Sequence, residues 1–359
     1  MVALQLAACT ASNTESAPPP PPLRLDGVQW LGTHNSYHVA PPVGLYARID
    51  ERAVAWDYTN PPIPEQLDAG VRGLELDVYV DDDARFATPI GPIPDATRPA
   101  MAKPGLKVFH VPDLDQGSTC ASLTDCLGDI AAWSAAHPTH LPILVMLECV
   151  AHDVGTRGVL HFTAPSPWGD AHLEQLEATL DSVLGQDRLI TPDLVRGEAA
   201  SVAEALRTSG WPSVESVRGK VLFVITNDAD VIQRQLARRP GLRGSPCFVE
   251  VDLDAPECAV LVLNDPQGQR DAIRRASDRH VLVRTRADAN LEEVRAGTTS
   301  RRDAALASGA NVVSSDALAV LRGSRQEGAG GYSVGFPNGA TARVHPRSGR
   351  ADAGQPLVP

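Results

Sequence analysis

The sequence GLELDVYV (residues 73–80) alternates aliphatic residues with Glu75, Asp77 and Tyr79. A period of two residues is typical of a β-strand, and side chains two positions apart then point to the same face. Two carboxylates on one inner face repel each other and raise each other's pKa unless a cation compensates. The stretch therefore predicts a central strand that carries a charged site.

Seven further runs have strand-like character: VQWLGTH (28–34), LKVFHV (106–111), PILVMLECV (142–150), KVLFVITN (220–227), CFVEVDL (247–253), HVLVRTRAD (280–288) and NVVSSDA (311–317). Amphipathic stretches such as 170–185 and 265–280 lie between several of them and predict helices. Alternating apolar strands and helices indicate a parallel sheet covered on both faces. Eight such units predict an α/β fold, a (β/α)8 TIM-type barrel over residues 25–325. The second half is irregular, because LDAPECAVLVLNDP (253–266) stands where a helix is expected.

The two ends of the chain differ from this pattern. LQLAAC, ending at Cys9, resembles the end of a bacterial lipoprotein leader, and the prolines of residues 18–22 predict a stiff spacer. This favours an extracellular or surface-anchored protein lipidated at Cys9, although an irregular N-terminus with an incidental cysteine is the alternative. Residues 1–24 are thus assigned to a leader and spacer, and residues 326–359 to a C-terminal extension.

Charge and cysteine content narrow the partners and the compartment. The formal net charge of −12 argues against nucleic acid or an anionic membrane as a broad electrostatic partner, so contact with lipid would be local. No later segment has the apolar length of a membrane span, and we expect a monomer. Local disulfides are predicted between Cys120 and Cys126 and between Cys247 and Cys258, with Cys149 as a buried thiol.

Ionisable and amide side chains stand at the ends of the first four predicted strands. Catalytic residues of such barrels lie where the strands end. The oxygen donors there are Asn35, Glu75, Asp77 and Glu148. An all-oxygen set suits calcium, or magnesium with retained water, and does not suit zinc or copper. The alternative for Glu75 and Asp77 alone is a salt-bridged strand end facing Arg72.

Two histidines flank the predicted cation. His34 and His110 end the first and third predicted strands, on either side of the carboxylate strand. One imidazole can accept a proton from an attacking hydroxyl while the other protonates the leaving oxygen, which fits cleavage of a phosphodiester.

Arginines end the seventh predicted strand, where Arg284 and Arg286 share a face. Arg284 is a candidate clamp for a phosphate or for sugar hydroxyls. The alternative is an ion pair with Asp288 or Asp316, and Asp316 is also placed to orient His34.

Together the motifs GTHNSYH, GLELDVY, VFHV followed by TC, VMLE, VRTRADAN and SRRDAALASGANVVSSDA resemble the calcium-dependent phosphoinositide-specific phospholipase C family, in its bacterial secreted form. The resemblance runs from about residue 28 to 346. It implies that His34 and His110 are the catalytic pair and that Arg284 binds the headgroup. It also implies one calcium ion, held by Asn35, Glu75, Asp77 and Glu148.

The resemblance further implies attack by the inositol 2-hydroxyl, deprotonated by His34 or by a metal-bound carboxylate, which yields diacylglycerol and a cyclic inositol phosphate. The chain has no convincing lysine pair for a phosphorylated ring, so phosphatidylinositol, or a soluble or glycosylated inositol phosphodiester, is the expected substrate. Two alternatives remain. One is a glycerophosphodiester phosphodiesterase, although asparagine here directly follows His34. The other is a barrel that binds inositol lipids or glycans without turnover.

Overall fold

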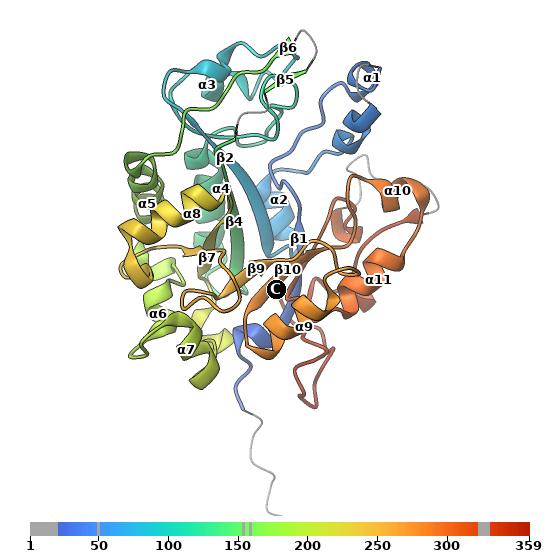
Figure 1. Ribbon diagram of the computed structural model, residues 1–359. Coiled ribbons are helices and arrows are strands. Elements are labelled where there is room, and N and C mark those ends of the chain that lie inside the picture. The colour runs from blue at the N-terminus through green and yellow to red at the C-terminus, as the bar shows by residue number, and fades with distance from the viewer. Residues whose placement is uncertain (1–20, 49–50, 153–154, 158–159, 322–330) are drawn as a thin grey trace, which may run out of the picture.

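The computed structural model describes residues 21–48, 51–152, 155–157, 160–321 and 331–359. Within these ranges, eight parallel strands form a nearly closed barrel with helices outside it, which confirms the predicted fold class (Figure 1). In spatial order they are β8 (Phe248–Val249), β7 (Val221–Asn227), β4 (Ile143–Val150), β2 (Gly73–Asp81), β1 (Val28–Thr33), β11 (Val312–Ser315), β10 (Leu282–Arg286) and β9 (Val260–Val262).

The barrel is open between β8 and β9, because no strand pairing joins them in the described part of the chain. A side chain spans the opening instead: Glu250 Oε1 accepts a hydrogen bond of 2.8 Å from the backbone N–H of Val262. Residues 251–259 connect the two strands through turns and bends. The predicted irregularity of the second half is therefore an opening in the barrel wall.

The strand prediction was wrong at two places: one predicted barrel strand lies outside the barrel, and one barrel strand was not predicted. Residues 106–111 were expected as the third barrel strand, but β3 (Gly105–Val108) pairs antiparallel with the last residues of β2, from Val78 to Asp81. β2 is long enough to extend beyond the rim of the barrel, and β3 pairs with this outer end. The missed barrel strand is β9, which lies in the stretch expected as a helix; only three residues long, it is too short to show a strand period.

Helices and short turns cover the outer face of the barrel. The described helices are α1 (Val43–Tyr46), α2 (Ile63–Asp68), α3 (Arg98–Met101), α4 (Leu123–Ala136), α5 (Asp170–Leu184), α6 (Pro192–Arg196), α7 (Val202–Thr208), α8 (Ala229–Arg238), α9 (Arg270–Asp278), α10 (Glu292–Ala296) and α11 (Ser300–Ala307). α5 and α9 confirm the two helical stretches predicted by amphipathicity. α1, α3 and the short hairpin of β5 (Thr156–Arg157) and β6 (Leu160–His161) lie beyond the C-terminal end of β2, at the top of Figure 1.

The barrel interior is divided into an apolar lower part and a polar upper part. Met146, Val224, Leu282 and Val312 are buried and belong to one apolar cluster. The strand register places Glu75 beside Met146, and alternation then points the side chains two residues further on into the same interior. The core therefore supports a charged layer at the C-terminal ends of the strands.

The C-terminal region adds an antiparallel strand, β12 (Ala342–Val344), to the start of β1, at the end opposite the charged layer. The assignment of residues 326–359 as a separate extension stays a prediction. The predicted leader and most of the spacer, including Cys9, lie outside the described residues. No helix in the described ranges is long and apolar enough to cross a membrane.

One of the two predicted disulfides is confirmed. Cys120 and Cys126 are bonded, with a Cα–Cα distance of 5.0 Å, and tie the start of α4 to the preceding loop. Cys247 and Cys258 are free and buried, which contradicts the second prediction. They pack into different apolar clusters, on the β8 and β9 sides of the opening. Cys149 is a buried free thiol, as predicted.

Candidate active site

A cleft of about 1430 Å³ opens at the C-terminal ends of the barrel strands. Five of the seven predicted site residues line it: His34, Asn35, Asp77, His110 and Glu148. Segments beyond the rim supply the rest of the wall, among them η2 (Glu51–Trp56) and the region of β6. Side chains far apart in the sequence thus converge as the barrel model required.

His34 is oriented by a carboxylate from the neighbouring strand end. Its Nδ1 lies 2.9 Å from Asp316 Oδ1, and the second oxygen of Asp316 accepts a hydrogen bond of 2.8 Å from Arg286. Burial, followed by the positive charge of Arg286, holds the pKa of His34 well below its usual value. The ring is therefore neutral near pH 7, and because Nδ1 is engaged, Nε2 is the nitrogen left to accept a proton. The predicted contact between Asp316 and His34 is confirmed.

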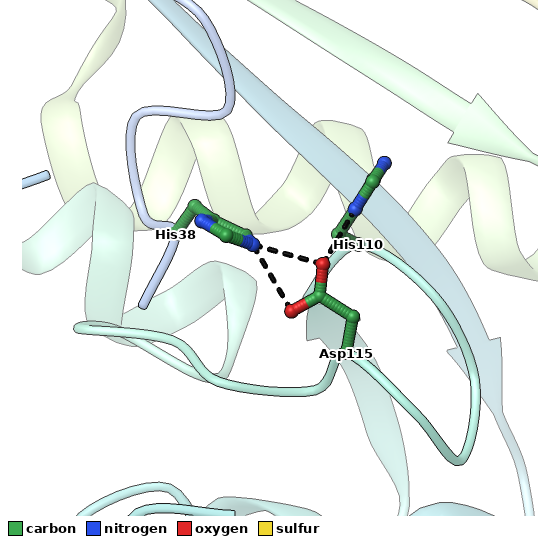
Figure 2. A group of neighbouring side chains, drawn as sticks. All are labelled: His38, His110 and Asp115. Atoms are coloured by element: carbon green, nitrogen blue, oxygen red, sulfur yellow. Dashed lines mark hydrogen bonds and ion pairs between the residues drawn. The ribbon is translucent and has the colours of Figure 1, made fainter. Parts of the chain in front are cut away.

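His110 reaches the cleft from the loop after β3, not from a barrel strand. Its Nδ1 lies 2.7 Å from Asp115 Oδ2, and His38 Nε2 lies 2.9 Å from the same oxygen (Figure 2). Burial alone would raise the pKa of Asp115, but His38 and the hydrogen bond from His110 outweigh it and lower that pKa. Asp115 is thus an ionised carboxylate between two imidazoles.

Neither His38 nor Asp115 is among the site residues predicted from the sequence. The loop HVPDLDQGSTC has no periodicity that would select Asp115, and an acidic residue five positions after His110 was the available signal. His38, His110 and Asp115 are the group, among the described residues, whose possible metal-ligating atoms lie within 4.8 Å of one another. Their hydrogen bonds already satisfy the facing ring nitrogens, so we interpret them as a hydrogen-bonded relay.

The predicted metal ligands form an acidic layer in the barrel. Asp77 and Glu148 are register partners on β2 and β4. Burial and then Glu148 raise the pKa of Asp77 well above its usual value, and burial and then Glu75 raise the pKa of Glu148 to about 7. Asp77 Oδ1 and Asn35 Nδ2 are buried without a hydrogen-bond partner in the described structure. Asp77 and Glu148 repel each other, and the set fits an oxygen-preferring cation.

Arg284 already compensates one of these acids. Its guanidinium donates to Glu75 Oε2 over 2.6 Å and to Ser314 Oγ over 3.0 Å, and its side chain is only 1% exposed. Burial would raise the pKa of Glu75, but Arg284, together with His34, Arg286 and the backbone N–H of Asn35, outweighs burial and lowers that pKa. Arg284 is therefore paired with Glu75 and not with the expected Asp288 or Asp316; Asp316 pairs with Arg286 instead. Arg284 does not line the cleft, and its role in substrate binding stays a prediction.

The ion pair also affects the metal site. Glu75, Asp77 and Glu148 do not bring one oxygen each within 4.8 Å of one another, the limit that the His38 group meets. Oxygens on opposite sides of one calcium ion, each bound at 2.3–2.6 Å, lie up to about 5.2 Å apart. The three acids could therefore hold one ion only in an arrangement wider than that of the His38 group.

Comparison with known proteins identifies relatives of this architecture. The family model for Ca²⁺-dependent phosphoinositide phospholipase C matches residues 23–346. A calcium-dependent phosphoinositol-specific phospholipase C from Pseudomonas sp, in its apo form, superposes with a TM-score of 0.54 at 15% identity, covering 90% of this chain and 96% of that one. The Ca²⁺-dependent phosphatidylinositol-specific phospholipase C from Streptomyces antibioticus gives 0.52 at 20% identity, covering 82% and 95%. At these identities the superpositions show the shared fold. A search of curated proteins finds no match.

Proposed function

Because the family match spans residues 23–346, the chain belongs to the Ca²⁺-dependent phosphoinositide phospholipase C family of enzymes, and we propose that it cleaves phosphatidylinositol or a related inositol phosphodiester. The products would be diacylglycerol and a cyclic inositol phosphate. The observation that carries this proposal is the pair of cleft histidines, each bonded at Nδ1 to a buried carboxylate.

The two histidines would divide the proton transfers. Neutral His34 accepts the proton of the inositol 2-hydroxyl at Nε2, and that oxygen attacks phosphorus. His110, protonated at Nε2, donates to the glycerol oxygen as its bond to phosphorus breaks. One P–O bond forms and one breaks, and the proton gained by His34 matches the proton lost by His110.

Asn35, Glu75, Asp77 and Glu148 would hold one calcium ion. When bound, the ion would stabilise negative charge on the phosphoryl oxygens and lower the pKa of the attacking hydroxyl. Support comes from the oxygen-only donor set, from the raised pKa of Asp77 and Glu148, and from the unpartnered Oδ1 of Asp77.

The cleft walls favour an unphosphorylated inositol headgroup. No lysine is among the described residues that line it, and its arginines share the wall with Glu51 and Glu292. Trp56, Phe162 and other apolar side chains stand in the same wall, which supports local contact with lipid in a chain of net charge −12. Action as an exported monomer, anchored through Cys9, belongs to the same proposal.

Turnover of two substrate classes tests the proposal. Purified protein is incubated with phosphatidylinositol vesicles or with glycerophosphodiesters, in calcium or in chelator, and products are followed by ³¹P NMR. We expect cyclic inositol phosphate in calcium, little in chelator, and losses of at least about 10³-fold for His34→Ala and His110→Ala. His140→Ala is the matched control, since His140 is buried but lies outside the cleft wall. Full activity in chelator would refute the mechanism, and glycerophosphate release without action on phosphatidylinositol would support the glycerophosphodiesterase alternative.

A further inference from the structure

We propose that Tyr58 and His38 are positioning residues that join the two acid–base pairs, His34–Asp316 and His110–Asp115, into one hydrogen-bonded frame. The inference rests on the proposed function, because it concerns how the two histidines are held for one reaction. Neither Tyr58 nor His38 lines the cleft, so both would act through the residues that do.

Tyr58 contacts both sides of the frame. Its hydroxyl oxygen lies 3.2 Å from His34 Nδ1, beside Asp316, and its backbone carbonyl accepts a hydrogen bond of 2.8 Å from His38 Nδ1. Its ring also stacks on the His38 imidazole, with centroids 4.1 Å apart and planes 26° apart. The residue is 2% exposed, so water does not compete for these contacts.

His38 carries the connection to His110. The Tyr58 carbonyl can only accept, so His38 Nδ1 must carry a proton. The ionised carboxylate of Asp115 also only accepts, so Nε2 carries a proton as well and donates to the two oxygens over 2.9 and 3.0 Å. The oxygen at 2.9 Å is the one that meets His110 Nδ1. With no exposed surface on His38, a lost contact would leave Asp115 free to turn away from His110.

Asn60 connects the segment that contains Tyr58 to the segment 34–38 through hydrogen bonds. Its backbone N–H donates to the carbonyl of His38, and its side-chain amide donates to the carbonyls of His34 and Asn35. Asn35 has a φ of 40°, in the left-handed region that costs energy for most residues. The segment 58–60 therefore holds the turn at Asn35 in the shape that presents His34.

The frame matters because both histidines must serve one phosphate from two sides. Small misplacements of proton-transfer groups cost far more in the chemical step than in binding. Loosening the frame should therefore lower kcat while leaving KM nearly unchanged.

Kinetics of four variants test this. We expect His38→Leu to lower kcat by about 10- to 100-fold with KM within about threefold, the range typical of lost orienting contacts. His38→Gln keeps a donor near Asp115 and should restore most of the activity. Tyr58→Phe should lower kcat about three- to tenfold by removing the hydroxyl beside His34. His140→Leu removes another buried histidine with both ring nitrogens bonded, and it should lower the melting temperature without changing kcat.

A double-mutant cycle and a spectroscopic readout separate positioning from general destabilisation. Since His38 acts through Asp115, His38→Leu in an Asp115→Asn background should cause no further loss. In ¹⁵N-histidine NMR of the neutral His110 ring, the wild type should hold the single proton at Nδ1, and His38→Leu should mix its tautomers; the protonated ring that donates at Nε2 carries both protons. Unchanged kcat, additive losses or an unchanged His110 tautomer would each overturn the inference. An inactive wild type would instead overturn the proposed function, while the tautomer spectrum would still decide on the frame. If His38→Leu does not fold, the loss in kcat for Tyr58→Phe, with KM nearly unchanged, tests the frame instead.

Discussion

The carboxylate of Asp316 lies between two donors, and this predicts what an amide would do in its place. One oxygen faces His34 Nδ1 at 2.9 Å and the other accepts from Arg286 at 2.8 Å. In Asp316→Asn the only amide oxygen must face the guanidinium, which can only donate. The amide NH₂ then faces His34 Nδ1 and forces that nitrogen to accept. The proton of His34 moves to Nε2, which can no longer take a proton from substrate.

The size of the effect follows from two contributions. Turning the amide the other way would set its NH₂ against the buried guanidinium and forfeit a charge-assisted hydrogen bond, at a cost of about 2–3 kcal/mol. The missing carboxylate also no longer stabilises the imidazolium formed on His34, which costs about 2–3 kcal/mol more. Together these contributions amount to about 4–6 kcal/mol, equivalent to a loss in kcat of about 10³- to 10⁴-fold.

The assay is initial-rate turnover of phosphatidylinositol in saturating calcium, with thermal unfolding recorded on each variant. Arg286→Met in the same chain removes the donor that fixes the amide, so the double variant should exceed Asp316→Asn by at least about tenfold in kcat. Arg286→Met alone is the control for lost charge. A kcat for Asp316→Asn within tenfold of the wild type, or a double variant no faster than the single one, would refute the tautomer argument.

Three other outcomes are expected. Because burial holds the pKa of His34 below 6.5, kcat/KM should be retained as the pH falls to 6.5 and lost only below it, as a pH–rate profile would show. Arg284→Met leaves Glu75 buried without its partner and should lower the free energy of unfolding by about 3–5 kcal/mol, with calcium restoring more of the melting temperature than in the wild type. Replacing Cys120 and Cys126 by serine should cost about 2 kcal/mol in urea unfolding, since the disulfide closes a short loop.

The barrel could be predicted because its long strands are recognisable from their own residues. β2 and β4 are buried runs whose apolar content and length leave few other interpretations. β3 resembles a barrel strand in sequence because its apolar residues pack on the outer end of β2. A run of four residues does not show whether the strand will pair parallel or antiparallel. β9 was missed because it is only three residues long, between a turn and a proline-containing loop, and so short a run shows no strand periodicity.

Site residues could be predicted only where the residue type and its position at the end of a strand were enough to identify them. His34, Asp77 and Glu148 were identified because rim position and residue type both pointed to them. The relay through His38 and Asp115 joins two loops 77 positions apart, and the bond from His34 to Asp316 spans 282. A sequence supplies the charges for such pairs, but the three-dimensional path of the chain decides which of them meet.

The placement of these pairs explains how the barrel can remain open without losing its site. β1, β2 and β11 lie in the middle of the parallel run, whereas β8 and β9 are its two ends. His34 depends on Asp316 beyond β11, and Glu75 depends on Arg284 from β10, so both pairs cross the closed side of the barrel. Closure between β1 and β11 therefore assembles the active site, and the opening at β8 and β9 interrupts neither pair. The wall is continuous where the proposed proton acceptor His34 is held, and on the other side the side chain of Glu250 bridges the opening.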